Sequence, residues 1–365
     1  MSKLNNNELA IIYLDYLGVS RKRIVNLLKH TAEPYLEICK EHLSGEVGTI
    51  LGKEKTEKLE EFDVKQSIKN LKVFLEEEDI SVVTVLSDNY PENLSNIPDA
   101  PIIIYYNGDI SLLNQDNLLA VVGTRKPTNY GRTVTQKFVS ELVTQGNIIT
   151  VSGLAYGIDS EVARVTLENR GKTIAVLGGG IRKIYPASNT ALAKKIVESG
   201  GLILSEYFPT ARPTQYTFPE RNRIVSGVSK GVLVIEAGEK SGSLITANLA
   251  IEQGKELFIV PGNINNANCI GGNNLIEEMP HTFTSSTKNI LKLFGVCTET
   301  TKKNTQVHQY SIEEQRVIDI LKTGEKTIDE LCEILKEDFK TINILLTEME
   351  IGGIIKKLTG DYYSI

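Results

Sequence analysis

The chain has 365 residues, of which 41% are hydrophobic and 24% charged. These values are ordinary for a globular protein and leave room for two or three domains. No apolar run approaches the roughly 18 residues that span a bilayer, and the start, MSKLNNNELA, lacks the apolar core of a signal peptide. Four scattered cysteines and four scattered histidines argue against a disulfide framework or a metal site. We therefore expect a cytoplasmic protein without metal that neither spans a membrane nor is secreted.

The charge is unevenly distributed along the chain, whose formal net charge is −6. Residues 116–295 hold 19 Lys/Arg and 14 Asp/Glu, a balance of +5, and the remainder holds 21 and 32, a balance of −11. A basic centre can attract phosphates in an acidic chain, because charges act over a Debye length of about 10 Å. A mixed surface with chance asymmetry is the alternative, and charge alone leaves both open.

The first part of the chain predicts helices. Residues 7–17 and 20–29 read as two short helices. Their junction, LGVSRKRIVNLL, resembles a helix-hairpin-helix, although a plain helical hairpin with a packed apolar face is the interpretation that we favour. Residues 53–79 are charged and carry an apolar stripe, which predicts helical structure there. We expect an N-terminal helical domain (SAM/HhH-like) over 1–79, followed by a β-rich lead-in over 80–115.

From residue 118 onward, β-branched apolar runs alternate with helical stretches. The runs cover residues 118–122, 147–151, 173–177, 201–205, 231–236 and 256–260. The helical stretches between them cover residues 131–145, 157–170, 188–199 and 243–253. Strands that are apolar on both faces and alternate with helices indicate a parallel sheet covered on both sides. The sequence therefore predicts an α/β fold, with an extended Rossmann-like parallel sheet in a domain over 116–295.

The end of the chain predicts a separate small domain. Residues 296–308 are polar and unpatterned, which is typical of a linker. Within 309–365, three helical patterns and a terminal hairpin predict a winged-helix domain. This segment holds 7 basic and 12 acidic residues, whereas a domain that approaches DNA phosphates should be basic. We therefore favour an accessory or protein-contact module over a duplex-DNA-binding one.

Loops rich in glycine and hydroxyl groups follow the predicted strands. In an open parallel sheet, ligands bind beyond the carboxyl ends of the strands, where these loops would meet. Glycines let backbone N–H groups approach a ligand, and helix N-termini favour anions. The loops therefore predict a phosphate-binding rim. Its candidate donors are Gly123, Ser152, Gly153, Gly178, Gly179, Gly180, Ser241, Gly242, Ser243 and Thr246.

No catalytic group of residues is recognisable. The dinucleotide fingerprint GxGxxG and the Walker loop are both absent. Ser152 and Ser241 lack a histidine nearby in the sequence. Asp159 and Glu236 could act as acid or base, although helix capping and loop bracing are the roles that we favour. We expect a protein that is not an enzyme and needs no cofactor.

Basic residues stand beside aromatic residues in the same loops. Cationic groups that follow a phosphate backbone, with rings on which bases stack, suit single-stranded nucleic acid. An internal salt bridge to Glu206 or Glu236 is the alternative for the two arginines of FPERNR. The candidate residues are Arg125, Lys126, Arg182, Lys183, Tyr185, Phe218, Arg221, Asn222 and Arg223.

The order and spacing of VVGTR, SGLAYGID, TIAVLGGG, FPERNRIVSG, SGSLITA and VPGN resemble the bacterial DNA-processing protein A (DprA/Smf) family over 82–285. The resemblance implies a DNA-binding homodimer that protects incoming single-stranded DNA and loads the recombinase RecA in natural transformation (competence). It implies that Arg125 contacts a phosphate beside Gly123 and Thr124, with FPERNR forming the next part of the pocket. By resemblance, the dimer contact comprises Ile251, Leu275 and Ile276.

Two positions depart from the family pattern. Family members often carry histidine where this chain has Arg164, and a basic residue where it has Ala187. A second hypothesis stays open beside the first. Related Rossmann-like domains include nucleotide sensors and nucleotide phosphoribohydrolases, and in such an enzyme Asp159 and Glu236 would act chemically.

Overall fold

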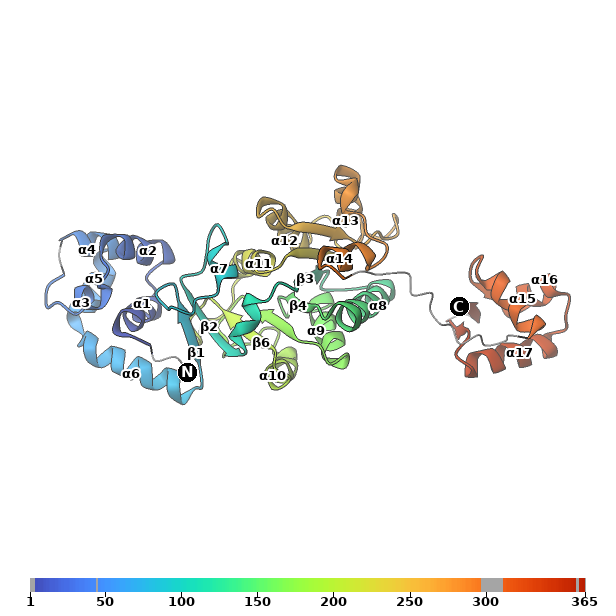
Figure 1. Cartoon of the computed structure of the whole chain (residues 1–365), viewed down its shortest axis with the longest axis horizontal. Coiled ribbons are helices and arrows are strands. Elements are labelled where there is room, and N and C mark those ends of the chain that lie inside the picture. Colours follow the sequence, from blue (N-terminus) through green and yellow to red (C-terminus); the bar gives the residue numbers. More distant parts are fainter. Residues whose placement is uncertain (1–3, 44, 297–310, 359–360, 365) are drawn as a thin grey trace. The chain divides into compact units, whose positions relative to one another are not determined.

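A computed structural model describes residues 4–43, 45–296, 311–358 and 361–364 (Figure 1). The chain divides into two compact units, Met1–Thr298 and Glu299–Ile365. The linker predicted over 296–308 lies outside the described residues except for its first residue.

Six helices open the first unit. They are α1 (Asn6–Tyr16), α2 (Arg21–His30), α3 (Pro34–Ile38), α4 (Gly45–Leu51), α5 (Lys53–Glu61) and α6 (Val64–Glu77). The two predicted helices α1 and α2 are confirmed, and the helical pattern predicted over 53–79 is present as two helices, α5 and α6. It breaks at Phe62, which is extended, and restarts at Asp63, whose carboxylate accepts the Gln66 N–H at 3.0 Å and caps α6.

The N-terminal helices share one core with the sheet that follows. Apolar side chains of α1, α2, α5 and α6 pack in a single cluster with residues of β2 (Ile103–Gly108) and β6 (Leu202–Ser205). Tyr105 on β2 is fully buried, and its hydroxyl donates to the Asp15 carboxylate of α1 at 2.7 Å. The helices are therefore fixed against the sheet by both apolar packing and a buried polar contact.

Replacing Asp15 with asparagine should stabilise the protein at neutral pH. Burial raises the pKa of Asp15 from 3.8 to about 6, against the opposing hydrogen bond from Tyr105. Between these values the folded state keeps a proton that the unfolded chain releases, so stability falls as the pH rises through this window. Asp15→Asn removes this titration. We expect its thermal unfolding midpoint to exceed that of the wild type at pH 7.5 by the equivalent of about 3 kcal/mol, and to match it at pH 4.

The exposed Asp116 supplies the control for this measurement. Asp116→Asn should show no such pH-dependent difference from the wild type. Equal pH profiles for Asp15→Asn and the wild type would contradict the assignment of this stability change to Asp15.

Eight strands of the described residues form one sheet in the order β1-β2-β6-β5-β4-β3-β7-β8. The bounds of β2 and β6 are given above. The other six strands are β1 (Ser81–Thr84), β3 (Leu118–Gly123), β4 (Ile149–Ser152), β5 (Thr173–Val176), β7 (Gly231–Ile235) and β8 (Glu256–Ile259). The six predicted strands β3 to β8 are present and parallel. Residues 80–115 add β1 and β2, which pair antiparallel at the β6 edge, so the lead-in extends the same sheet.

Helices cover both faces of the sheet (Figure 1). Leu119 and Val121 of β3 face α8 (Asn129–Gly146), α9 (Ile158–Glu168) and α14 (Lys288–Leu293), whereas the alternate residues Ala120 and Val122 face α11 (Thr217–Gly227) and α12 (Gly242–Glu252). The remaining short elements of this unit are α7 (Glu92–Ser95), η1 (Ile110–Asn114), η2 (Ala187–Asn189), α10 (Thr190–Glu198), α13 (Ile270–Glu278) and η3 (Pro280–Thr282). The predicted Rossmann-like fold is confirmed.

The strand order reverses between β3 and β7. The chain builds outward from β3 through β4, β5 and β6, and then returns to place β7 and β8 on the other side of β3. At such a switch point, the loops that leave the two neighbouring strands diverge and open a crevice at their carboxyl ends.

The second unit contains three helices and a small antiparallel sheet. They are α15 (Ile312–Leu321), β9 (Lys326–Thr327), α16 (Ile328–Leu335), α17 (Phe339–Ile351), β10 (Lys356–Lys357) and β11 (Tyr362–Ser364). Val317, Leu331 and Leu346 from the three helices meet in its core. The three helices and the terminal hairpin of β10 and β11 follow the predicted order, whereas β9 is a strand that the sequence did not predict. Across the described parts of both units, no helix combines the length and apolar character that crossing a membrane requires.

Candidate nucleic-acid interface

A pocket of about 980 Å³ lies at the switch point. Its walls are the loops after the parallel strands β3 to β8 and the first turns of α11 and α12. Of the predicted binding residues, it is lined by Gly123, Thr124, Arg125, Lys126, Gly153, Tyr185, Phe218, Arg221, Asn222, Ser241, Gly242 and Ser243. The structure therefore brings most of the predicted rim into one concave surface.

Glu236 holds the loop after β3 in place. Its buried carboxylate accepts the Thr128 N–H at 2.9 Å and also the Thr128 hydroxyl. Its backbone carbonyl accepts the Thr124 N–H at 2.8 Å. Because both carboxylate oxygens are engaged by the loop, the bracing role that we favoured for Glu236 is confirmed.

Asp159 braces the loop after β4 in the same way. Its buried carboxylate accepts the Gly153 N–H at 3.0 Å and the Ala155 N–H at 3.4 Å. Burial raises its pKa, against the lowering effect of the neighbouring Arg221 guanidinium. The Gly153 N–H that we expected to meet a ligand is therefore already bonded, as is the buried Ser152 hydroxyl, which donates to the Asp159 carbonyl at 3.4 Å.

Arg221 forms the cationic floor of the pocket. Its side chain is only 4% exposed, and its Nη1 donates to the carbonyls of Gly153, at 2.8 Å, and Val176. Burial lowers the pKa of this guanidinium to about 10, which still leaves it charged at neutral pH. In the described part of the chain, its Nη2 has no hydrogen-bond partner, so a donor remains for an anion. The internal salt bridge to Glu206 or Glu236, which we gave as the alternative for Arg221, does not form at this residue.

Arg125 lies at the mouth of the pocket beside aromatic rings. It is exposed, and its guanidinium carbon lies 5.3 Å from the centroid of the Phe218 ring. The Tyr185 ring follows Phe218 at 5.5 Å. No carboxylate of the described residues forms an ion pair with Arg125, so its charge is available to a phosphate. A cation above a ring beside further rings is suited to a nucleotide backbone and its bases.

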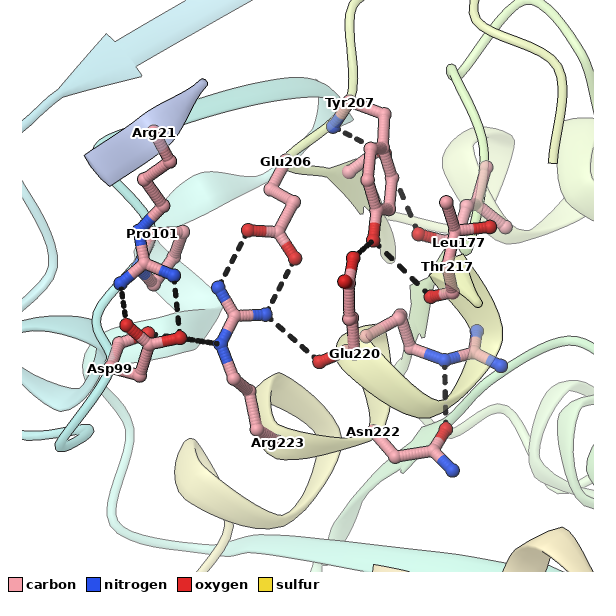
Figure 2. Close-up of polar contacts among 12 residues, drawn as sticks. Arg21, Asp99, Pro101, Leu177, Glu206, Tyr207, Thr217, Glu220, Asn222 and Arg223 are labelled. Atoms are coloured by element: carbon pink, nitrogen blue, oxygen red, sulfur yellow. Dashed lines mark hydrogen bonds and ion pairs between the residues drawn. The ribbon is translucent and has the colours of Figure 1, made fainter. Parts of the chain in front are cut away.

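Arg223 does not belong to this pocket, although only one residue separates it from Arg221. Its guanidinium forms a two-point ion pair with Glu206, at 2.5 and 2.6 Å, with both side chains about 10% exposed (Figure 2). It also pairs with Asp99 at 3.2 Å, which in turn pairs with Arg21 of α2 (Figure 2). The prediction that it faces a phosphate is replaced by the internal salt bridge that we gave as the alternative, because its donors are occupied by carboxylates.

The three glycines after β5 also lie outside the pocket lining. A Cβ on Gly178 would lie 2.7 Å from the Phe218 ring, and one on Gly180 would lie 2.2 Å from the carbonyls of Phe208 and Pro209. The Gly180 N–H donates to the Ala211 carbonyl at 2.9 Å. A Cβ on Gly179 would likewise meet Pro213. The three glycines therefore allow close packing against the segment between β6 and the start of α11, rather than contact with a ligand. Lys183 is exposed but does not line the pocket either.

The pocket also contains polar residues that sequence reasoning did not select. Lys240 stands immediately before Ser241, the N-cap of α12. Asn268 comes from the loop after β8, and its amide donates to the Lys126 carbonyl at 3.0 Å. A lysine directly before a helix N-cap was a usable signal for Lys240, whereas nothing near Asn268 in the sequence predicts its contact with Lys126.

The predicted dimer residues gather near the end of α12 and on α13. Ile251 is 43% exposed, whereas Leu275 and Ile276 are partly buried against the core. The exposure of these three residues within one chain does not test the dimer contact, which stays a prediction.

The fold and the pocket define a doubly wound α/β protein that presents a cationic, ring-lined surface at its switch point, an arrangement suited to phosphate compounds. Comparison with known proteins identifies the family to which this α/β protein belongs. The chain belongs to the DNA recombination-mediator protein A family, whose sequence pattern matches residues 81–295. The family resemblance drawn from the motifs is confirmed.

Named relatives agree with this assignment. The DNA processing protein DprA of Bacillus subtilis is 41% identical over 202 residues, which cover 55% of this chain and 67% of the relative. The X-ray structure of DNA processing protein A from Streptococcus pneumoniae matches with a TM-score of 0.66 and 33% identity, over 80% of this chain and 98% of that one. The Helicobacter pylori protein, solved to describe its single-stranded DNA binding mode, matches with a TM-score of 0.52 and 31% identity, over 58% and 94%.

Proposed function

We propose that this protein binds single-stranded DNA in the switch-point pocket and acts as a recombination mediator. The observation that carries the proposal is the Arg125 guanidinium above Phe218, which pairs with none of the described carboxylates, beside the Arg221 donor of the same pocket. The family membership and the single-stranded DNA binding mode described for the Helicobacter pylori relative support the choice of DNA over other phosphate compounds.

We propose further that the protein is a binding protein rather than an enzyme. The two carboxylates that an enzyme of the nucleotide-hydrolysing kind would use, Asp159 and Glu236, are both engaged by backbone N–H groups of the neighbouring loops. A carboxylate held in this way is poorly placed to exchange a proton with a substrate. This observation favours the mediator over the phosphoribohydrolase-like alternative.

The partners follow from the same proposal. A mediator delivers its strand to a recombinase, so we propose that RecA receives the DNA in the cytoplasm and that two copies of the chain associate through the surface around Ile251 and α13. The partial exposure of Ile251 is consistent with such a contact.

Titration with labelled oligothymidine and with duplex DNA across salt concentrations tests the proposal. We expect single strands to bind without strict sequence preference and more tightly than duplex, with log affinity falling by roughly 0.7 per phosphate contact for each tenfold rise in salt. Incubation with nucleoside monophosphates should release no free base. Equal affinity for both forms of DNA, or release of base, would contradict the proposal.

A further inference from the structure

A second pocket, of about 1030 Å³, adjoins the first. Arg125 and Lys126 line both pockets, so the loop after β3 is the ridge between them. The other walls of the second pocket come from the loop after β4, from η2, from the first turn of α8 and from one side each of α9 and α10. None of the residues contributed by these helices was selected from the sequence as part of a binding site.

The lining of this second pocket is cationic. It contains Arg125, Lys126, Arg132, Arg164 and Lys195, against one acidic residue, Glu168. Glu161, which is not a lining residue, pairs with both Arg132 at 3.7 Å and Arg164 at 2.5 Å. This one carboxylate, itself only 15% exposed, is shared by two guanidiniums that are about half exposed. The cluster therefore keeps a positive balance, and the exposed sides of both guanidiniums can meet a phosphate.

A row of aromatic rings connects the two pockets. Phe218 and Tyr185 line the first pocket, and their ring centroids lie 5.5 Å apart. Tyr185 meets Tyr156 edge to face at 6.3 Å, and Tyr156 lines the second pocket. Both tyrosines are 48% exposed, although burial of such rings is favourable. Exposed rings in sequence along a cationic surface provide stacking positions for successive bases.

We propose that the second pocket binds the continuation of the same DNA single strand, with its phosphates on Arg164 and Lys195 and its bases over Tyr185 and Tyr156. This inference rests on the proposed function of the first pocket and extends it to a longer strand. The shared ridge of Arg125 and Lys126, together with the connecting rings, favours a continuous strand over a separate small phosphate compound, which would need no such connection.

The experiment compares a short and a long oligothymidine, of about 5 and about 15 nucleotides, on the full chain carrying Arg164→Ala and Lys195→Ala. Each phosphate contact contributes roughly 0.7 to the slope of log affinity against log salt concentration. The loss of two contacts should therefore lower this slope by about 1.4 for the long strand and weaken its binding about 25-fold at 0.1 M salt. Binding of the short strand, which the first pocket holds, should stay unchanged and thereby shows that the variant is folded.

Lys194 provides a matched control, because it neighbours Lys195 on α10, is 78% exposed and does not line the pocket. Lys194→Ala should bind both strands as the wild type does. Unchanged binding of the long strand by the double variant would overturn this inference while leaving the proposed function intact, and equal weakening for both strands would overturn it as well. Failure of the wild type to bind either strand would instead refute the proposed function.

Discussion

Arg125→Ala should weaken binding of single-stranded DNA by roughly 10- to 100-fold, the range expected for loss of a charge-assisted hydrogen bond. Arg125 is exposed, lines both pockets and forms no ion pair with a described carboxylate, so its charge is free for a phosphate. The salt slope should fall by about 0.7, because one phosphate contact is removed. Fluorescence anisotropy with labelled oligothymidine at several salt concentrations measures both quantities.

Lys172→Ala is the matched control for this variant. Lys172 is also an exposed cation. It directly precedes β5 and so lies at the amino ends of the parallel strands, whereas the pocket lies at their carboxyl ends. It should retain both the affinity and the slope of the wild type. If Arg125→Ala bound oligothymidine with unchanged affinity, Arg125 would not be the phosphate contact.

Arg223→Ala should lower the free energy of unfolding of the first unit by about 3–5 kcal/mol, because it leaves the Glu206 carboxylate buried without its partner. The same change also removes the contact that joins Asp99 to α11. A urea or thermal unfolding series measures the loss. Binding of single-stranded DNA, measured well below the unfolding temperature, should be retained, because Arg223 does not line the pocket.

The double variant Arg223→Met with Glu206→Leu separates the lost charge pair from the unpaired carboxylate. Apolar replacement of both partners should recover much of the stability, since neither charge then remains buried. If Arg223→Ala instead kept its stability and lost DNA affinity as Arg125→Ala does, Arg223 would contact the strand, as we first predicted from the sequence.

Much of the sheet was predictable, because each parallel strand is an apolar run bounded by a loop. Helix α11 was not predicted, since FPERNR is polar and contains Pro219, which is tolerated here because it lies in the first turn. That omission also explains the error at Arg223. Residues two apart on a helix point in nearly opposite directions, about 200° apart, so Arg221 and Arg223 cannot face one ligand.

Other parts of the site could not be predicted from sequence. A glycine needed for close packing looks the same as one that admits a ligand, and Gly180 is of the first kind because its position faces two carbonyls. The second pocket depends on Arg132, Arg164 and Lys195, which come from three different helices. Their charges combine only when the chain folds.

The bonds between Glu236 and Thr128 have a consequence for the kinetics of DNA capture. The loop backbone that carries Arg125 is held at Thr124 and Thr128 by hydrogen bonds to Glu236, which the protein makes from its own residues. An incoming strand thus meets a loop that is already ordered, and little conformational entropy is lost on the protein side. Association should then proceed in a single step at a rate set by diffusion and electrostatic attraction, without a slower phase of loop rearrangement.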